Sequence, residues 1–96
     1  MSAAVAIYST DYCGYCVRAK ALFTKKGVPY DEIDVSDRGD LRQWLMAATR
    51  QRTVPQIFIN GRSVGGFIDI AELDRKGTLD RLLSEEPRAE DPPIRR

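Results

Sequence analysis

Short apolar segments alternate along this chain with longer polar stretches, and turn-forming residues separate them. Residues 3–9, AAVAIYS, form a continuous apolar run that predicts a buried strand. Residues 29–35, PYDEIDV, place apolar side chains on a second predicted strand. Residues 53–60, TVPQIFIN, predict a third strand after their proline. The Asn-Gly pair that begins at Asn60 predicts a tight hairpin into a fourth strand over residues 62–66.

Helical spacing of apolar residues indicates helices in the intervening stretches. The first helix follows the first strand and ends at Gly27, which is a natural C-terminal stop. The second begins after a polar cap at Ser36 or Asp37. A third helix over residues 69–77 and a short fourth over residues 78–84 complete the pattern. The apolar positions that predict the first two helices are Val17, Ala21, Leu22, Phe23, Leu41, Trp44, Leu45 and Ala48.

The predicted order β-α-β-α-β-β-α indicates one α/β domain over residues 1–84. The first β-α-β unit should be a right-handed parallel crossover, and the last two strands should form an antiparallel hairpin. This arrangement gives a four-stranded mixed sheet flanked by helices. Residues 85–96, EEPRAEDPPIRR, are charged and proline-rich with almost nothing apolar, so we expect a mobile C-terminal tail.

Composition narrows the possible functions. The chain has 96 residues, a net charge of +1 and no histidine. The balanced charge gives no electrostatic footprint for nucleic acid or an anionic membrane. Without imidazole, one chain cannot form a histidine-dependent triad or a zinc site with His ligands. The N-terminus lacks the basic lead of a secretory signal, so we expect a cytoplasmic protein in a reducing compartment.

Two cysteines, Cys13 and Cys16, lie at the predicted turn from the first strand into the first helix. The leading amides of a helix have no internal partners, and they stabilise a thiolate placed there. We therefore expect Cys13 to be the exposed nucleophile and Cys16, one turn deeper, to resolve a mixed disulfide. A buried structural cysteine explains Cys16 alone. A zinc site needs about four ligands, which two thiols provide only through dimerisation.

CGYC at this turn, RTVPQIFING and VGGFID together resemble a glutaredoxin of the small bacterial dithiol type, over Val5 to Leu83. The resemblance implies a thioredoxin-like fold with Pro55 in cis. It implies a glutathione-dependent thiol-disulfide oxidoreductase that reduces protein–glutathione mixed disulfides and protein disulfides. Glutathione would be the co-substrate, and glutathione reductase would act indirectly by recycling it.

The same resemblance assigns roles to individual residues. Cys13 would attack the sulfur of a glutathionylated protein and keep the glutathione, while Cys16 would resolve disulfides of Cys13 in the dithiol route. Asp69 would pair with the γ-glutamyl ammonium, although an N-cap role explains it equally well. Thr53 could be only a turn residue. The glutathione-binding residues that the resemblance implies are Tyr15, Thr53, Val54, Pro55, Gly66, Phe67 and Asp69.

Three positions depart from the family pattern. Gly14 stands where a proline usually follows the first cysteine, which restores a backbone N–H and loosens the turn. Thr10 stands where relatives often have a lysine that stabilises the thiolate, so Arg18, Lys20 or the stretch Arg50–Arg52 would have to compensate. Phe67 stands where many relatives have another cysteine, and this leaves only the backbone contact.

Two other functions fit the same motif. Gly14 favours a [2Fe–2S] carrier in which two subunits bridge a cluster through Cys13 and one glutathione each, so the metal site would exist only in a dimer. Without a cluster we expect a monomer with no metal. A redoxin fed by thioredoxin reductase is the third alternative, but the glutathione-groove motifs argue against it.

Overall fold

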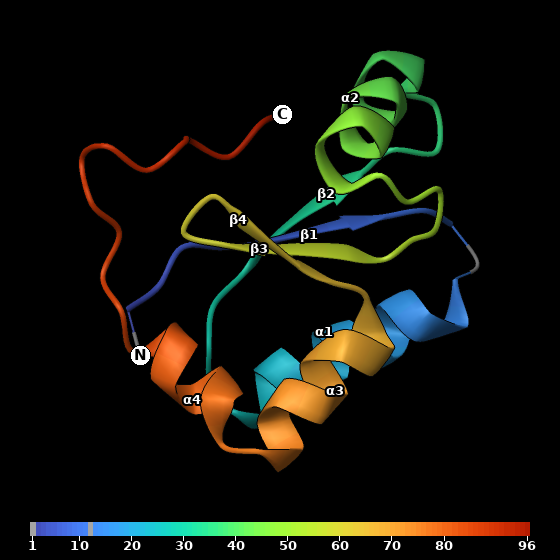
Figure 1. Cartoon of the computed structure of the whole chain (residues 1–96). Coiled ribbons are helices and arrows are strands. Elements are labelled where there is room, and N and C mark those ends of the chain that lie inside the picture. Colours follow the sequence, from blue (N-terminus) through green and yellow to red (C-terminus); the bar gives the residue numbers. More distant parts are fainter. Residues whose placement is uncertain (1, 12) are drawn as a thin grey trace.

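The structure, a computed structural model, describes residues 2–11 and 13–96. A central sheet separates helices on its two sides (Figure 1). Four strands form the sheet in the order β2-β1-β3-β4. The strands are β1 (Val5–Ser9), β2 (Asp31–Asp34), β3 (Gln56–Ile59) and β4 (Arg62–Gly65). The helices are α1 (Gly14–Lys25), α2 (Gly39–Thr49), α3 (Phe67–Arg75) and α4 (Thr78–Leu83).

The sheet is mixed, as the sequence predicts. β1 pairs in parallel with β2 and antiparallel with β3, and β3 pairs antiparallel with β4. Asn60 and Gly61 have φ values of 52° and 79°, which two-residue hairpin turns of type I′ require. The predicted element order, the parallel β1-α1-β2 unit and the β3-β4 hairpin are therefore confirmed.

Hydrophobic clusters lie on both faces of the sheet, which explains why β1 is buried throughout. One cluster contains Ile7 and Ile57 and packs against α1, α3 and α4. The other contains Tyr8 and Phe58 and packs against α2. Both clusters hold fully buried side chains, each worth about 1.5–3 kcal/mol of transfer free energy. The sheet is thus anchored from both sides, and this holds the start of α1 at one end of β1.

The buried face of α1 differs from the predicted one. Cys16, Ala19 and Phe23 are buried, whereas Val17 is 60% exposed and Ala21 is exposed. Cys16, Ala19 and Phe23 follow helical spacing, so the helix is rotated toward its second cysteine. The prediction of Val17 and Ala21 as core positions was wrong, because the buried face of α1 is formed by Cys16, Ala19 and Phe23.

The predicted cap and one core position of α2 were also wrong. The residue before the helix is Arg38, which makes no side-chain cap, and Ala48 is exposed. The Ser36 hydroxyl instead accepts a hydrogen bond from the backbone N–H of Asp11 at 3.0 Å. Ser36 therefore ties β2 to the segment before the cysteines.

Residues 85–96 contain no helix or strand, but they run back toward the sheet, and the C-terminus lies near α2 (Figure 1). Ile94 packs against the cluster under α2, a contact that the composition of the tail does not predict. The mobility of this tail stays a prediction, whereas its place beside the sheet is a finding. No helix in the described part of the chain is long and apolar enough to cross a membrane.

Candidate active site

Cys13 is the N-cap of α1, the residue directly before the helix. Its backbone is extended (φ −105°, ψ 108°), and its Sγ accepts a hydrogen bond from the backbone N–H of Cys16 at 3.2 Å. A sulfur in this position faces the positive end of the helix dipole and a free helical amide. The sulfur is partly exposed, so an incoming disulfide can reach it.

Cys16 lies one turn deeper and is only 2% exposed. Burial, and to a lesser extent the hydrogen bond with Cys13, raise the pKa of its thiol from 9.0 to about 12. Both cysteines are free thiols in this structure. The two sulfurs are therefore chemically unequal, because Cys16 stays protonated at neutral pH and is shielded from solvent.

The loop before β3 lies directly beside Cys13. The Val54–Pro55 peptide bond is cis, as the family resemblance implies. The Cys13 thiol donates a hydrogen bond to the backbone carbonyl of Val54 across 3.7 Å. The start of α1 and the entry of β3 therefore meet at the Cys13 sulfur, although the two segments are distant in sequence.

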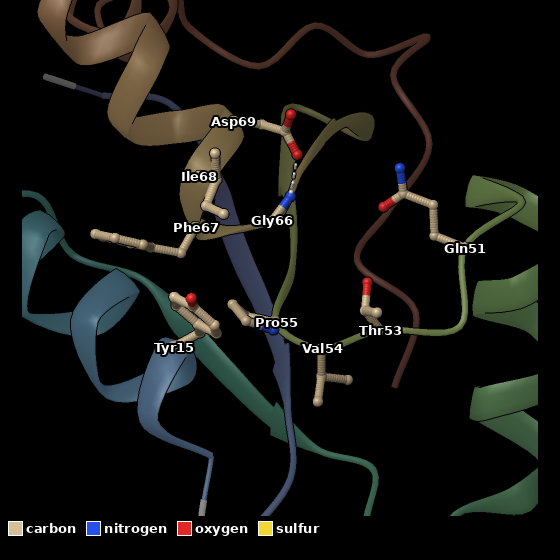
Figure 2. A pocket seen from close by; sticks show the side chains of 9 residues that line it. All are labelled: Tyr15, Gln51, Thr53, Val54, Pro55, Gly66, Phe67, Ile68 and Asp69. Carbon is tan, nitrogen blue, oxygen red and sulfur yellow. Dashed lines mark hydrogen bonds between the residues drawn. The ribbon is translucent and has the colours of Figure 1, made fainter.

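A pocket of about 230 Å³ opens next to this meeting point (Figure 2). It is lined by Tyr15, Gln51, Thr53, Val54, Pro55, Gly66, Phe67, Ile68 and Asp69. All seven residues that the resemblance predicts for glutathione lie in this one wall. Ile68 is an addition that the motifs do not single out, and it is 69% exposed at the rim.

Asp69 shapes the far end of the pocket from the first turn of α3. Its carboxylate accepts a hydrogen bond from the backbone N–H of Gly66 at 2.9 Å, shown as a dashed line in Figure 2. This contact starts α3 at Phe67, two residues before the predicted start. Gly65 has φ +95°, and a Cβ there would lie 2.7 Å from the carboxyl carbon of Asp69. Gly65 is thus required by the close approach of Asp69, whereas a Cβ at Gly66 would lie 3.2 Å from the Pro55 carbonyl oxygen.

Tyr15 and Phe67 form an aromatic wall on the side of the pocket near α1 (Figure 2). Their rings are stacked with centroids 6.1 Å apart. The guanidinium of Arg18 lies 5.6 Å from the centre of the Tyr15 ring, within cation–π range. Phe67 therefore fills space that a smaller cysteine would leave open, and it supports a half-exposed Tyr15.

Gln56 supports the pocket from beneath, and the sequence analysis did not identify it. Its side chain is fully buried, and its Nε2 donates to the Thr53 carbonyl and to Gln51 Oε1, each at 2.9 Å. Its Oε1 has no hydrogen-bond partner in the described part of the chain. The sequence feature that could have identified Gln56 is its position as a polar residue in an otherwise apolar strand. Such a residue is buried only where it makes specific hydrogen bonds.

Basic side chains extend the pocket along α2. A neighbouring hollow of about 170 Å³ shares Gln51, Thr53 and Val54 with the pocket and adds Arg42 and Arg52 to its lining. Of the predicted compensating stretch Arg50–Arg52, residues 51 and 52 therefore reach this region. Arg42 was not predicted, because its place depends on how α2 packs.

Lys20, another of the predicted compensating cations, forms an ion pair with Glu32. Lys20 Nζ lies 2.9 Å from Glu32 Oε2, which also accepts a hydrogen bond from Ser9 at 2.8 Å. The paired lysine lowers the pKa of Glu32, and the carboxylate raises the pKa of Lys20. Lys20 lines the same hollow as Thr10 and Cys13 but is already paired with Glu32, so compensation by Lys20 stays a prediction.

The side of Cys13 that faces away from the pocket is acidic. A hollow of about 510 Å³ there includes Cys13, Cys16, Asp11 and Asp34 in its lining. The neighbouring Asp34 carboxylate raises the pKa of Asp11. Thiols at the junction of an apolar pocket and a polar hollow suit exchange between two disulfide partners of different chemistry.

The comparisons agree with this geometry. The glutaredoxin family profile matches residues 5–64. The chain belongs to the glutaredoxin family. It is 46% identical to the glutaredoxin of Pseudomonas aeruginosa over 80 residues, covering 83% of this chain and 95% of that protein. It is 42% identical to glutaredoxin 3 of Escherichia coli K12 over 79 residues, covering 82% and 95%.

A solved structure shares the fold. The buckwheat glutaredoxin–glutathione complex superposes with a TM-score of 0.80 at 36% identity, over 85% of this chain and 77% of that one. The thioredoxin-like fold with its four-stranded mixed sheet is thus confirmed. The chain is a dithiol glutaredoxin, a glutathione-dependent thiol-disulfide oxidoreductase with a CxxC site.

Proposed function

We propose that Cys13 is the nucleophile and that glutathione occupies the pocket beside it. The thiolate of Cys13 attacks the glutathione sulfur of a protein–glutathione mixed disulfide. A Cys13–glutathione disulfide forms, and the protein thiolate leaves and takes up a proton. A second glutathione thiolate then attacks this disulfide, which releases oxidised glutathione and returns Cys13 as a thiolate. The observation that carries the proposal is the 3.7 Å approach of Cys13 Sγ to Val54 at the pocket edge.

The pocket presents a suitable surface to each part of the tripeptide. The backbone of Val54 offers hydrogen bonds to the cysteinyl residue, as in a short β-addition. Thr53 and Pro55 line the same stretch, and Tyr15 covers the apolar side. These contacts orient the glutathione sulfur toward Cys13, which favours attack on that sulfur over the protein sulfur.

The two charged ends of glutathione would lie at opposite ends of the groove. The Gly66 N–H is occupied by Asp69, so the γ-glutamyl carboxylate would bind the next free helical amides, those of Phe67 and Ile68. Asp69 would then pair with the γ-glutamyl ammonium. The glycine carboxylate would face Arg52, which lines the adjoining hollow.

Cys16 would act only in the dithiol route. Its thiolate would attack the Cys13 sulfur of a mixed disulfide, expel the other thiolate and leave a Cys13–Cys16 disulfide, which glutathione then reduces. The high pKa of Cys16 keeps it a poor competitor for external disulfides. It becomes effective only when its neighbour is already oxidised and the two sulfurs are adjacent.

The partners in this proposal are glutathione and glutathionylated or disulfide-bonded proteins. Glutathione reductase supports turnover indirectly, and nucleic acid and membranes take no part. The reaction needs free thiols and abundant glutathione, so we place it in a reducing compartment such as the bacterial cytoplasm. The pocket favours glutathione over direct reduction by thioredoxin reductase as the source of electrons.

The [2Fe–2S] alternative requires two chains. In the described residues, no group of three or more His, Cys, Asp and Glu side chains converges as a metal site. Such a cluster needs four ligands of the thiolate type, which Cys13 and one glutathione from each of two chains would supply. Cluster binding through Cys13 of two chains stays a prediction, which iron and sulfide analysis after anaerobic reconstitution with glutathione would test.

The location of glutathione can be tested by NMR on the Cys16→Ser protein converted to its Cys13–glutathione disulfide. We expect large amide shifts at Val54, Phe67 and Ile68 relative to the reduced protein. Amides of the β3–β4 turn at Gly61 should not move and serve as the internal control. Shifts confined to the acidic hollow around Asp11 and Asp34 would place glutathione on the wrong side of Cys13 and overturn the assignment.

A further inference from the structure

Residues 85–96 follow a defined path from α4 back across the sheet to α2 (Figure 1). At the start of this path, Asn60 Nδ2 donates to the carbonyl of Glu85 at 2.9 Å. At its end, Arg96 forms an ion pair with Asp31 of β2 at 2.9 Å. The segment is thus attached at both ends, to the β3–β4 turn and to the opposite edge strand.

Between these ends lies a groove with an aromatic floor. Tyr8 of β1, Phe58 of β3 and Trp44 of α2 contact one another pairwise, with ring centroids 5.5 Å apart in each pair. Gly61 and Ala6 widen the groove on the other side. Without a cover, this surface would be a contiguous apolar patch on a small domain, which is unusual unless the patch binds something.

The C-terminal segment fills this groove with apolar and directional contacts. Pro92, Pro93 and Ile94 line it from above, and Ile94 packs on the aromatic cluster. Pro92 approaches Gly61 so closely that a Cβ there would lie 2.7 Å from the proline ring. The turn at Gly61 therefore leaves room for the proline.

Two polar contacts fix the register of the segment. Tyr8 is 1% exposed, and its hydroxyl donates to the backbone carbonyl of Arg95 at 2.6 Å. A buried hydroxyl without an acceptor is costly, so β1 carries a donor whose partner is supplied by the tail. The Arg95 guanidinium lies 5.5 Å from the centre of the Trp44 ring.

We propose that this face is a recognition groove for a proline-rich segment that ends in arginines, and that residues 91–96 occupy it within the same chain. The features match the docking of extended proline-rich segments: an aromatic groove, prolines that are stiff before binding, and a hydrogen bond to a main-chain carbonyl. Because Trp44 belongs to α2, the docked segment contacts both α2 and the sheet and holds the two together. On this proposal, residues 91–96 of the C-terminal tail are docked in the resting protein and not mobile.

Trp44 is the only tryptophan of the chain, so its fluorescence reports directly on the groove. We would compare acrylamide quenching of Trp44 in the full chain and in a chain ending at residue 90. Truncation should raise the quenching constant by about twofold or more, because the cover of the indole is lost. The peptide of residues 91–96, at millimolar concentration, should reverse the change in the truncated chain and leave the full chain unaffected.

Matched variants and protein concentration complete the test. The same peptide carrying Ile94→Ala should bind much more weakly, whereas Arg88→Ala in the full chain should leave quenching unchanged. Equal quenching in the full and truncated chains, or no binding of the peptide, would overturn the proposal. Protection of Trp44 that depends on protein concentration would also overturn it, because a second copy would then supply the segment. If the truncated chain does not fold, Ile94→Asp in the full chain must raise quenching, and unchanged quenching rejects docking.

Discussion

The side-chain amide of Gln56 donates to the backbone carbonyl of Thr53 at 2.9 Å and approaches the Thr53 hydroxyl at 3.4 Å. Gln56 is the first residue of β3, and Thr53 lies on the far side of the cis Val54–Pro55 bond. The buried amide thus holds the loop that places Val54 beside Cys13. Gln56 contacts no substrate in the proposed mechanism, so it affects substrate binding only by positioning this loop.

Replacing Gln56 with Met keeps the side-chain length and removes the donor. We expect the KM for the glutathionylated substrate to rise by roughly tenfold, equivalent to the loss of about 1.4 kcal/mol of binding. The kcat should change little, because Cys13 and its helix remain in place. Steady-state kinetics with a glutathione-reductase-coupled assay measures both parameters.

Gln56→Glu is the matched control, since it keeps an acceptor but offers the Thr53 carbonyl a donor only when protonated. Its KM should approach the value of the unmodified protein at low pH and rise as the carboxyl ionises. A Gln56→Met protein whose kcat falls while its KM stays constant would show that Gln56 acts on the chemistry and not on loop position.

Gly65→Ala should damage the pocket from its other end. A Cβ at Gly65 would overlap the Asp69 carboxylate, and the residue would be held at φ +95°, which costs about 1–3 kcal/mol. We expect weaker glutathione binding and a lower melting temperature. Gly39→Ala is the control, because a Cβ there has no atom within 4 Å. Equal affinities of the two variants for reduced glutathione, measured by an NMR titration of each, would refute the role given to Asp69.

The two thiols should differ sharply toward alkylating reagents. In the native reduced protein at pH 8, iodoacetamide should modify Cys13 and leave Cys16 intact, because Cys16 is buried and its pKa is about 12. Peptide mass spectrometry after brief exposure identifies the modified site. In denaturant both cysteines should react. Equal native reactivity of Cys13 and Cys16 would contradict the proposed division between nucleophile and resolving thiol.

Stability should fall at alkaline pH. The folded pKa of Cys16 is raised above its ordinary value of 9.0, so the unfolded chain loses this proton first as the pH rises. The associated stability is complete below about pH 9 and decreases by roughly 1.4 kcal/mol per pH unit between the two pKa values. Burial also raises the pKa of Tyr8, which adds a decrease above pH 10. We would measure the free energy of unfolding in urea between pH 8 and 11. It should decrease less steeply with pH in Cys16→Ala than in the parent protein, and an identical pH dependence would exclude the thiol as the cause.

The sequence predicted what depends on local pattern and short motifs. The strands, the Asn60–Gly61 hairpin and the mixed sheet follow from alternation and turn chemistry. The predicted pocket residues converge because the motifs fix the start of α1, the entry of β3 and the start of α3. Even the exposed Val17, wrongly placed in the core, lies in a correctly predicted helix. Only the rotation of that helix was wrong, because Cys16, Ala19 and Phe23 form its buried face.

Features that depend on contacts between distant segments were missed. Gln56 gains its role only when the chain folds back on Gln51 and Thr53. Ile94 meets an aromatic cluster formed by three separate elements, and no local pattern in a charged tail indicates this. Arg42 reaches the hollow that adjoins the glutathione pocket only through the packing of α2. Composition describes such residues as solvated or mobile, whereas tertiary packing gives them partners.

The central claim is that Cys13 alone carries out glutathione exchange from the pocket. The most direct measurement is the rate at which Cys16→Ser and Cys13→Ser proteins remove glutathione from a model mixed disulfide, coupled to glutathione reductase. The account predicts sustained turnover by Cys16→Ser and loss of turnover by Cys13→Ser, with both proteins folded. Sustained turnover by Cys13→Ser, or an inactive but folded Cys16→Ser protein, would contradict it.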